Sequence, residues 1–318
     1  MERNLALELV RVTEAAALAS ARWMGKGDGD AADRAAREAI STVLRSVKMS
    51  GRVVIGDTDI EIDEPARKGA ARGNNGPDVD IAVDALQSIQ SLAFGRPHAI
   101  STIAVSNRGA FLVPPVPYMR KIAVGPDAAG CIDLSASALD NLVNIADAKR
   151  CYVEDLTVFI LDRDRHRALI DDVRTAGARI ALIPDGDLTA MIATAVPGSG
   201  VDVVMGTGGS AEGVLAAAAL KCVGGDLQAR FEPRDDDEHE ALRKSPYGQS
   251  DQVLRVDDFV RGESTMFAAT GITGSDVLSG VQFVPGGAIT HSIVMRSQSG
   301  TVRQITAHHR FDRKPVYT

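Results

Sequence analysis

The chain has 318 residues, of which 45% are hydrophobic and 24% are charged, and its formal net charge at pH 7 is −7. This length and composition are typical of a globular protein with two domains, or with one large layered α/β unit. The negative charge disfavours non-specific binding to nucleic acid or to an anionic membrane surface, so we expect neither as a partner.

The cysteines and the N-terminal segment indicate a cytoplasmic protein. Cys131, Cys151 and Cys222 lie far apart and form no C-x-x-C pair, which argues against a disulfide scaffold or a zinc site. The opening segment MERNLALELVR is charged, unlike the apolar core of a signal peptide. No stretch approaches the roughly 18 consecutive apolar residues of a membrane-spanning helix. We therefore expect a soluble, cytoplasmic protein.

The first half of the chain predicts two helices followed by strands. Asn4 can cap a helix whose apolar positions recur close to the helical period: Leu5, Leu9, Val12, Ala16 and Trp23. After the loop GKGDGD, Asp30 can cap a second helix that continues to Val47. Strands are expected at residues 52–55, 79–83, 100–105 and 110–113.

The second half changes its pattern after about residue 150. Strands at 156–161, 179–184 and 201–206, with a helix at 165–174, predict βαβ units, and an alanine-rich helix follows at 211–220. The polar residues 232–251 indicate an exposed insertion, and short alternating strands end the chain. We expect two α/β halves, 1–150 and 151–318.

Acidic residues gather in the first half. The buried-strand pattern VDIAVD carries Asp80 and Asp84, and Asp28, Asp30 and Asp33 lie upstream in GKGDGDAADRA. More acids follow in VVIGDTDIEIDEP. So many carboxylates cannot crowd one site unless a cation neutralises them, which predicts an oxygen-ligand site for Mg²⁺ or Mn²⁺. Asp28 and Asp30 have an alternative role as helix caps.

Ordered blocks along nearly the whole chain carry a family resemblance. They are LALELVRVTEAAALASARWMGKGD, VVIG, VDIAVD, YMRKIAVGP, CIDLSASALDNL, IPDGD, VDVVMGTGGSAEGV, AATGITGSDVLSG and TVRQITAHHRFDRK. The chain resembles the class II fructose-1,6-bisphosphatases, some of which also act on sedoheptulose-1,7-bisphosphate. The resemblance implies a layered α/β sugar-phosphatase fold of the inositol monophosphatase and fructose bisphosphatase type, and a homo-oligomer.

The resemblance also implies a metal site and a catalytic group. Its metal ligands would be Asp33, Asp57, Asp84 and Glu212. The family motif GEGE reads GDTD here, so Asp57 and Asp59 replace glutamates. Glu61 or Asp63 matches a family aspartate associated with water activation, and unshifted spacing favours Glu61.

The loop after VDIAVD departs from the family pattern D-P-x-E-G-T, because this chain has D-A-L-Q-S-I. Gln87 offers a neutral amide oxygen in place of a charged ligand. Ser88 replaces a glycine that lets backbone N–H groups approach phosphate. Ile89 replaces a threonine whose hydroxyl would help to position water. At Gly29, many relatives carry a lysine.

The residues that the resemblance assigns to substrate are better preserved. They are Tyr118, Arg163, Arg165, Asp185, Gly186, Asp187 and Gly209, together with Gln87 and Ser88 in the altered loop. Arginine suits phosphate through its bidentate fork. The alternative for Arg163 and Arg165 is a surface charge cluster with neighbouring aspartates.

Together these features predict a metal-dependent phosphatase that hydrolyses a phosphate ester of a sugar phosphate or bisphosphate. The altered loop leaves two alternatives open: a silent paralogue that binds a sugar phosphate, or an enzyme redirected to another sugar-phosphate reaction. A third reading, a dinucleotide site, rests on the single weak pattern G-x-G-x-x-A in GTGGSA.

Overall fold

The computed structural model describes residues 4–57, 60, 76–248 and 251–313. The chain forms two compact units, Met1–Phe111 with Gly262–Thr318, and Leu112–Arg261. These bounds differ from the expected halves, 1–150 and 151–318. The reason is long-range strand pairing: β10 (Thr265–Gly271) pairs with β3 (Ile100–Asn107), so the C-terminal strands complete the first sheet.

The sheet of the first unit is mixed. Its described strands run in the order β1, β2, β3, β10, β12, β11, with β13 paired to β12. Only β1 and β2 are parallel among the pairs described. The remaining bounds are β1 (Ser50–Gly56), β2 (Asp78–Gln87), β11 (Gln282–Val284), β12 (Gly287–Arg296) and β13 (Thr301–Arg310).

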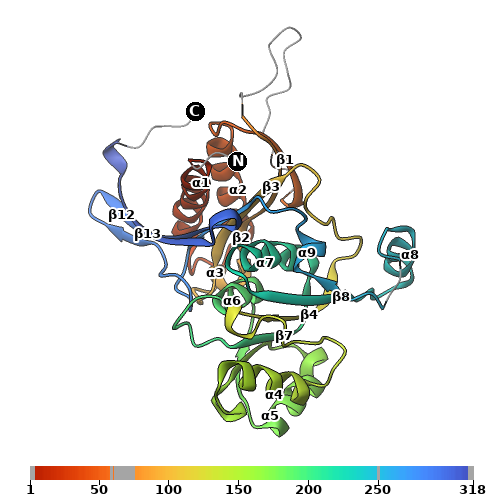
Figure 1. Cartoon of the computed structure of the whole chain (residues 1–318). Coiled ribbons are helices and arrows are strands. Elements are labelled where there is room, and N and C mark those ends of the chain that lie inside the picture. The colour runs from red at the N-terminus through yellow and green to blue at the C-terminus, as the bar shows by residue number, and fades with distance from the viewer. Residues whose placement is uncertain (1–3, 58–59, 61–75, 249–250, 314–318) are drawn as a thin grey trace. The chain divides into compact units, whose positions relative to one another are not determined.

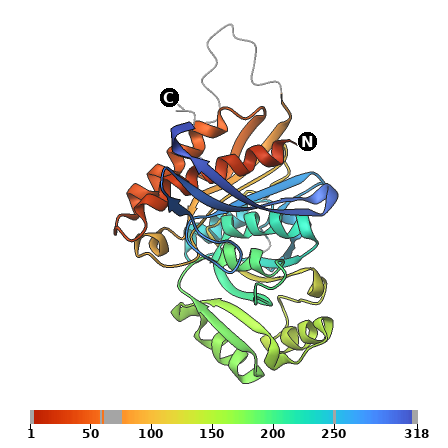
Figure 2. The same cartoon turned by 90° about the vertical axis from the view of Figure 1, so that its left-hand side faces the viewer.

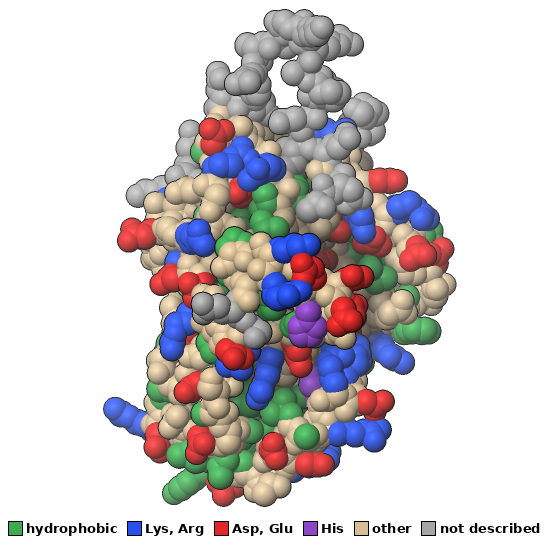
Figure 3. Space-filling view, turned by 90° about the vertical axis from the view of Figure 1, so that its right-hand side faces the viewer, with side chains coloured by type: hydrophobic (Ala, Val, Ile, Leu, Met, Phe, Trp, Pro, Cys, Tyr) green, Lys and Arg blue, Asp and Glu red, His purple; other side chains and the backbone are tan. Residues whose placement is uncertain are grey.

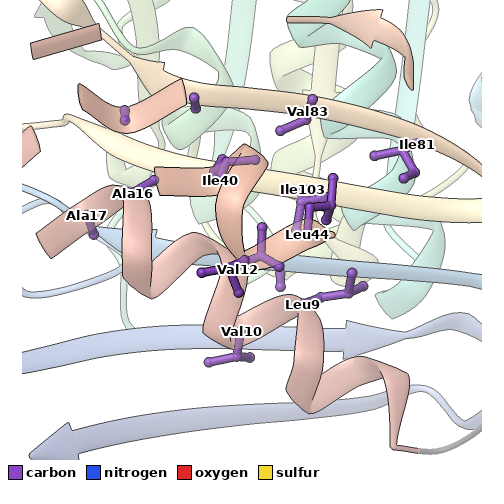
Figure 4. Packing of buried hydrophobic residues seen from close by; sticks show 14 of the residues in the cluster. Leu9, Val10, Val12, Ala16, Ala17, Ile40, Leu44, Ile81, Val83 and Ile103 are labelled. Atoms are coloured by element: carbon purple, nitrogen blue, oxygen red, sulfur yellow. The ribbon is translucent and has the colours of Figure 1, made fainter. Parts of the chain in front are cut away.

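Two long helices pack on this sheet, α1 (Leu5–Ser20) and α2 (Gly29–Leu44). Their apolar positions meet strand residues in one buried core, as Figure 4 shows for Leu9, Val12, Ile40, Leu44, Ile81, Val83 and Ile103. The helical period in the sequence therefore identified the core face of α1 correctly. Shorter helices complete the unit: η1 (Ala21–Trp23), α3 (Ile89–Ala93), η5 (Ser297–Ser299) and η6 (Phe311–Arg313).

The second unit also has a mixed sheet, with its described strands in the order β6, β5, β7, β4, β8, β9. The central strand β4 is antiparallel to both β7 and β8, whereas β5 is parallel to β6 and β7. The bounds are β4 (Tyr118–Val124), β5 (Thr157–Leu161), β6 (Arg179–Ile183), β7 (Val203–Gly209), β8 (Asp226–Phe231) and β9 (Leu254–Arg255).

Helices cover both faces of this second sheet (Figures 1 and 2). One layer holds α4 and α5, and the other holds α6 and α7. The bounds are α4 (Ala138–Lys149), α5 (Arg167–Ala176), α6 (Asp187–Ala193), α7 (Ser210–Val223), α8 (Asp236–Lys244) and α9 (Val256–Phe259), with η2 (Pro126–Ala128), η3 (Val153–Asp155) and η4 (Asp164–His166). The expected polar insertion at 232–251 contains the exposed helix α8.

Charged side chains of both signs are spread over the surface of the protein. Figure 3 shows acidic and basic side chains intermingled over the face that it draws. No helix within the described residues is both long enough and apolar enough to cross a membrane.

Candidate active site

A close approach between β1 and β2 fixes the first acidic residue. Gly56, at the end of β1, has a φ of +81°, and a Cβ there would lie 1.8 Å from the carbonyl oxygen of Val83. Only glycine fits that position. The next residue, Asp57, donates its backbone N–H to the same Val83 oxygen at 3.1 Å, and its Oδ2 accepts from the N–H of Ala85 at 2.8 Å. The Asp57 carboxylate is therefore held beside the stretch of β2 that contains Asp84.

A second acid reaches the same place from α2. Asp33 and Asp57 both form ion pairs with Arg37: its Nε lies 2.9 Å from Asp33 Oδ2 and 3.4 Å from Asp57 Oδ1. The two carboxylates are only 18% and 16% exposed. Sequence reasoning missed Arg37, although its position four residues after Asp33 places both on one helix face. Acids from α2 and from the end of β1 thus converge on one cationic group.

These carboxylates fit a divalent cation in their chemistry and placement. Carboxylate oxygen is a preferred ligand of Mg²⁺, which usually keeps several waters and takes one or two protein carboxylates. Asp33 and Asp57 already reach a common cation, the Arg37 guanidinium. Within the described residues, no three His, Cys, Asp or Glu side chains form a ready-made metal-binding group.

Asp80 has a different role from the one expected beside Asp84. It is buried near the start of β2, where its carboxylate accepts from Arg52 and Arg108 at 3.2 Å each and from the N–H of Gly109 at 2.6 Å. Two arginines therefore neutralise this acid, so the expectation that it holds a cation with Asp84 is corrected. Asp28, and not Asp30, caps α2, because its side chain accepts from the N–H of Ala31.

The altered loop turns sharply at Ser88. This residue has a φ of 67° in the left-handed region, where a non-glycine residue costs roughly 1–2 kcal/mol. That conformation explains why a glycine suits the family pattern here. The Ser88 hydroxyl donates to the amide oxygen of Gln87 at 2.8 Å, and both side chains are buried. The amide oxygen of Gln87 is thus already an acceptor within the loop.

In the second unit, Lys121 is the centre of a buried polar cluster. Its Nζ donates to Asp187 Oδ2 at 2.7 Å and to the carbonyl oxygen of Gly209 at 2.8 Å, and its side chain is 3% exposed. Sequence reasoning missed this residue. Its signal was a lysine at a buried-face position of β4, with apolar Met119 two residues before it and Ala123 two residues after it; Met119 and Lys121 both face α7.

Glu212 belongs to the same cluster. A Cβ at Gly209 would lie 1.9 Å from Glu212 Oε2, so glycine is required for this carboxylate to fold back over the turn between β7 and α7. Burial raises the pKa of Glu212, the charge of Asp187 adds to that rise, and Lys121 opposes it. The structure therefore brings Asp187, Gly209 and Glu212 together as a group.

Asp185 and Gly186 lie directly before this group. Burial raises the pKa of Asp185, the hydrogen bond from the Gly186 N–H opposes that rise, and the Asp187 charge adds to it. The positive charge of Arg163 also lowers the Asp185 pKa. The carboxyl groups of Asp185 and Asp187 thus lie close together in a poorly solvated region. Buried polar groups need partners, so these carboxyl groups favour a hydroxyl donor or a cation beside them.

Tyr118 lies close to two arginines. The guanidinium carbon of Arg165 is 5.7 Å from the centre of the Tyr118 ring, and that of Arg234 is 4.2 Å from it. Arg165 also donates to the carbonyl oxygen of Thr207 at 2.8 Å. Asp164, one of the two aspartates of the alternative charge cluster, pairs with Arg167 at 2.7 Å. Arg234 was not identified from the sequence.

Comparison with known proteins agrees with these observations. Residues 3–309 match the family described as "Bacterial fructose-1,6-bisphosphatase, glpX-encoded". The chain is 40% identical, over 332 residues, to fructose-1,6-bisphosphatase 1 class 2 of Escherichia coli (strain K12), an alignment that covers 99% of this chain and 97% of that protein. The same figures hold for the class 2 enzymes of Escherichia coli O6:H1 and of Shigella flexneri. The chain belongs to the class 2 fructose-1,6-bisphosphatase family.

Membership in the class 2 family confirms the resemblance found in the sequence and the layered α/β fold expected from it. Class 2 fructose-1,6-bisphosphatases are metal-dependent phosphatases. The expected catalytic residues Asp59 and Glu61 lie outside the described residues, as does Asp63, the alternative to Glu61.

Proposed function

We propose that this protein is a metal-dependent sugar bisphosphatase, with fructose-1,6-bisphosphate as its first candidate substrate and Mg²⁺ or Mn²⁺ as its cofactor. The observation that carries the proposal is the convergence of Asp33 and Asp57 on one cationic group, in a chain of the class 2 family. The cysteine pattern supports a cytoplasmic location, and the family resemblance supports a homo-oligomer.

The proposed metal ligands are Asp33, Asp57, Asp84 and Glu212. A divalent ion held by such carboxylates neutralises phosphate charge and lowers the pKa of a water that attacks phosphorus. We assign removal of the water proton to Asp59 or Glu61, an assignment that rests on the family resemblance. Gln87 and Ser88 are proposed to face the substrate phosphate, although their mutual hydrogen bond occupies part of their capacity.

The arginines around Tyr118 are proposed to hold the second phosphate. Arg165 is fixed by the Thr207 carbonyl oxygen, and both it and Arg234 are exposed enough to accept an anion. Arginine binds phosphate in a bidentate manner, so a preorganised guanidinium favours a ligand with a phosphate at each end. Asp185, Gly186, Asp187 and Gly209 would bind sugar hydroxyls, with Arg163 nearby as a further cation.

The proposal is tested by phosphate release from a panel of sugar mono- and bisphosphates, with Mg²⁺, with Mn²⁺ and with EDTA. We expect turnover of a bisphosphate that requires the metal. Absence of turnover from folded protein with every compound would overturn the proposal, and would leave the binding or redirected paralogue that the altered loop raised.

A matched pair of variants tests the grip on the second phosphate. Arg165→Met should raise KM for the bisphosphate and leave KM for monophosphates nearly unchanged. Arg167→Met is the control, because Arg167 is exposed and pairs with Asp164. Equal effects of the two substitutions would contradict the assignment of Arg165.

A further inference from the structure

We propose that Arg37 is an internal counter-cation of the metal site, which a divalent ion must displace from Asp33 and Asp57. This inference rests on the proposed function, because it takes these two acids as metal ligands. Arg37 Nε lies 2.9 Å from one carboxylate and 3.4 Å from the other. The guanidinium therefore occupies the place where the two carboxylates come together.

Guanidinium and metal exclude each other at this place for two reasons. Both need the same carboxylate oxygens, because a divalent ion binds them at roughly 2.0–2.6 Å. Both are also positively charged, and like charges a few ångströms apart in a partly buried site repel strongly. Arg37 and the metal thus compete, and the affinity measured for the metal includes the free energy of releasing Arg37.

The surroundings of Arg37 allow that release. Its side chain is 36% exposed and lines a groove of about 350 Å³ along α2, together with Glu38, Ser41, Thr42, Arg45 and Ile60. On this inference, the released guanidinium enters the groove, on the side of α2 that carries Glu38 and Arg45. Glu38 lies on the groove as an acidic neighbour that can receive it.

The consequence is a protein that folds without its metal and binds it only when the ion is abundant. With Arg37 in place, its single positive charge offsets part of the negative charge of Asp33 and Asp57 in the metal-free state, so their mutual repulsion destabilises the fold less. A chain with a neutral residue at position 37 has no such compensation. Its metal-free state is less stable, and its affinity for the metal is higher.

Metal binding without substrate tests this directly. In Arg37→Met we expect Mn²⁺, followed by electron paramagnetic resonance of the free ion, to bind about tenfold more tightly than in the unaltered protein, a coupling of ordinary size. Arg34→Met is the matched control, because Arg34 is exposed on the same helix and its loss changes net charge equally. The control should bind Mn²⁺ as the unaltered protein does.

Stability gives a second readout. In EDTA, Arg37→Met should unfold at a lower denaturant concentration than Arg34→Met, and saturating Mn²⁺ should stabilise it more. If Arg37→Met binds Mn²⁺ no more tightly than the unaltered protein, while Asp33→Asn binds it more weakly, Arg37 is not a competitor and only this inference fails. If Asp33→Asn leaves Mn²⁺ binding unchanged, the proposed metal site itself fails.

A measurement on the unaltered chain keeps the inference testable if Arg37→Met does not fold. The Nε–H proton of Arg37, followed by ¹⁵N NMR, should be protected from solvent exchange in EDTA and lose that protection on titration with Mg²⁺. Protection that persists at saturating Mg²⁺ would overturn the inference.

Discussion

Ile89 and Gly29 pack against each other so closely that a Cβ on Gly29 would lie 2.6 Å from Cγ2 of Ile89. In the sequence these are two separate departures from the family pattern, one in the GKGDGD loop and one in the altered D-A-L-Q-S-I loop. In the structure they form a single contact between α2 and α3. The absence of a side chain at position 29 is thus coupled to the bulk of the residue at position 89.

This contact predicts non-additive stability. Gly29→Ala should destabilise the protein by about 1–3 kcal/mol, the usual range for overpacking. Ile89→Ala removes the methyl group that would clash with the new Cβ. The double variant Gly29→Ala with Ile89→Ala should therefore lose less unfolding free energy than the sum of the losses of the two single variants. Denaturant unfolding of the four proteins in a double-mutant cycle measures the difference.

Gly274→Ala is the matched control for this cycle. A Cβ at Gly274 would meet nothing within 4 Å, so the substitution should change the unfolding free energy little. Additive effects at positions 29 and 89 would show that the backbone relaxes enough to remove the contact.

The buried pair of Lys121 and Asp187 predicts a large stability loss. Lys121→Met leaves Asp187 without its cation in a site where Lys121 is 3% exposed. Removing one partner of a buried ion pair typically destabilises by about 3–5 kcal/mol. Adding Asp187→Leu should recover part of the loss, because the Asp187 carboxylate is then no longer left buried without its cation.

Lys149 provides the comparison for Lys121. It pairs with Asp202 at 2.9 Å, but the two side chains are 25% and 18% exposed. Lys149→Met should therefore cost no more than about 1 kcal/mol. A similar loss for both lysines, measured by denaturant unfolding, would contradict a special role for the Lys121 cluster.

His166 predicts a loss of stability in mild acid. Its Nε2 accepts from the backbone N–H of Thr207 at 2.8 Å, so the ring proton is on Nδ1, which donates to the carbonyl oxygen of Leu161 at 2.7 Å. Protonation would turn Nε2 into a donor that faces another donor. Burial lowers the His166 pKa from its ordinary value of 6.5, the hydrogen bond to Leu161 opposes this, and the Arg165 charge adds to it.

A lowered histidine pKa fixes the sign of the effect. Below pH 6.5 the histidine of the unfolded chain binds a proton, whereas His166 of the folded chain does not. The unfolding free energy therefore decreases as the pH is lowered, until the pH passes below the pKa of His166 in the folded state. Denaturant unfolding between pH 8 and pH 5 should show this fall. His166→Gln should flatten it, whereas His239→Gln, at an exposed position on α8, should leave it unchanged.

Local order could be predicted from the sequence, because it depends on nearest neighbours. The period of Leu5, Leu9 and Val12 gave the buried face of α1, and apolar runs gave β2, β5 and β7. The cap of α2 was misplaced by two residues, since Asp28 and Asp30 are both good capping residues and only the loop geometry distinguishes them.

Contacts between distant segments could not be predicted in the same way. Lys121 and Asp187 are 66 residues apart, and their meeting depends on the pairing of β4 with β7. The return of β10 to β3 likewise depends on sheet assembly and not on any local signal. The pairing of Arg37 with Asp33 could have been predicted from their spacing of four residues on one helix. The pairing of Arg37 with Asp57 could not, because the segment after β1 brings Asp57 to it.

The altered loop yields the last prediction. Gln87→Glu places a carboxylate at a position that is 4% exposed, where the Ser88 hydroxyl already donates to the side chain. In EDTA this buried charge should destabilise the protein by about 1–3 kcal/mol, and a divalent ion should reverse the loss by taking the carboxylate as a ligand. Combined with Ile89→Thr, which supplies a hydroxyl, the change should raise metal-dependent bisphosphatase activity.

Gln90→Glu is the control for charge alone, since Gln90 is exposed three residues away. It should alter neither stability in EDTA nor activity. Thermal unfolding with EDTA and with Mg²⁺, and kcat/KM with fructose-1,6-bisphosphate, measure both effects. If Gln87→Glu loses the same stability with and without metal and the double variant gains no activity, position 87 does not contact the ion. The glutamine would then be a structural part of the loop, held by its bond from Ser88.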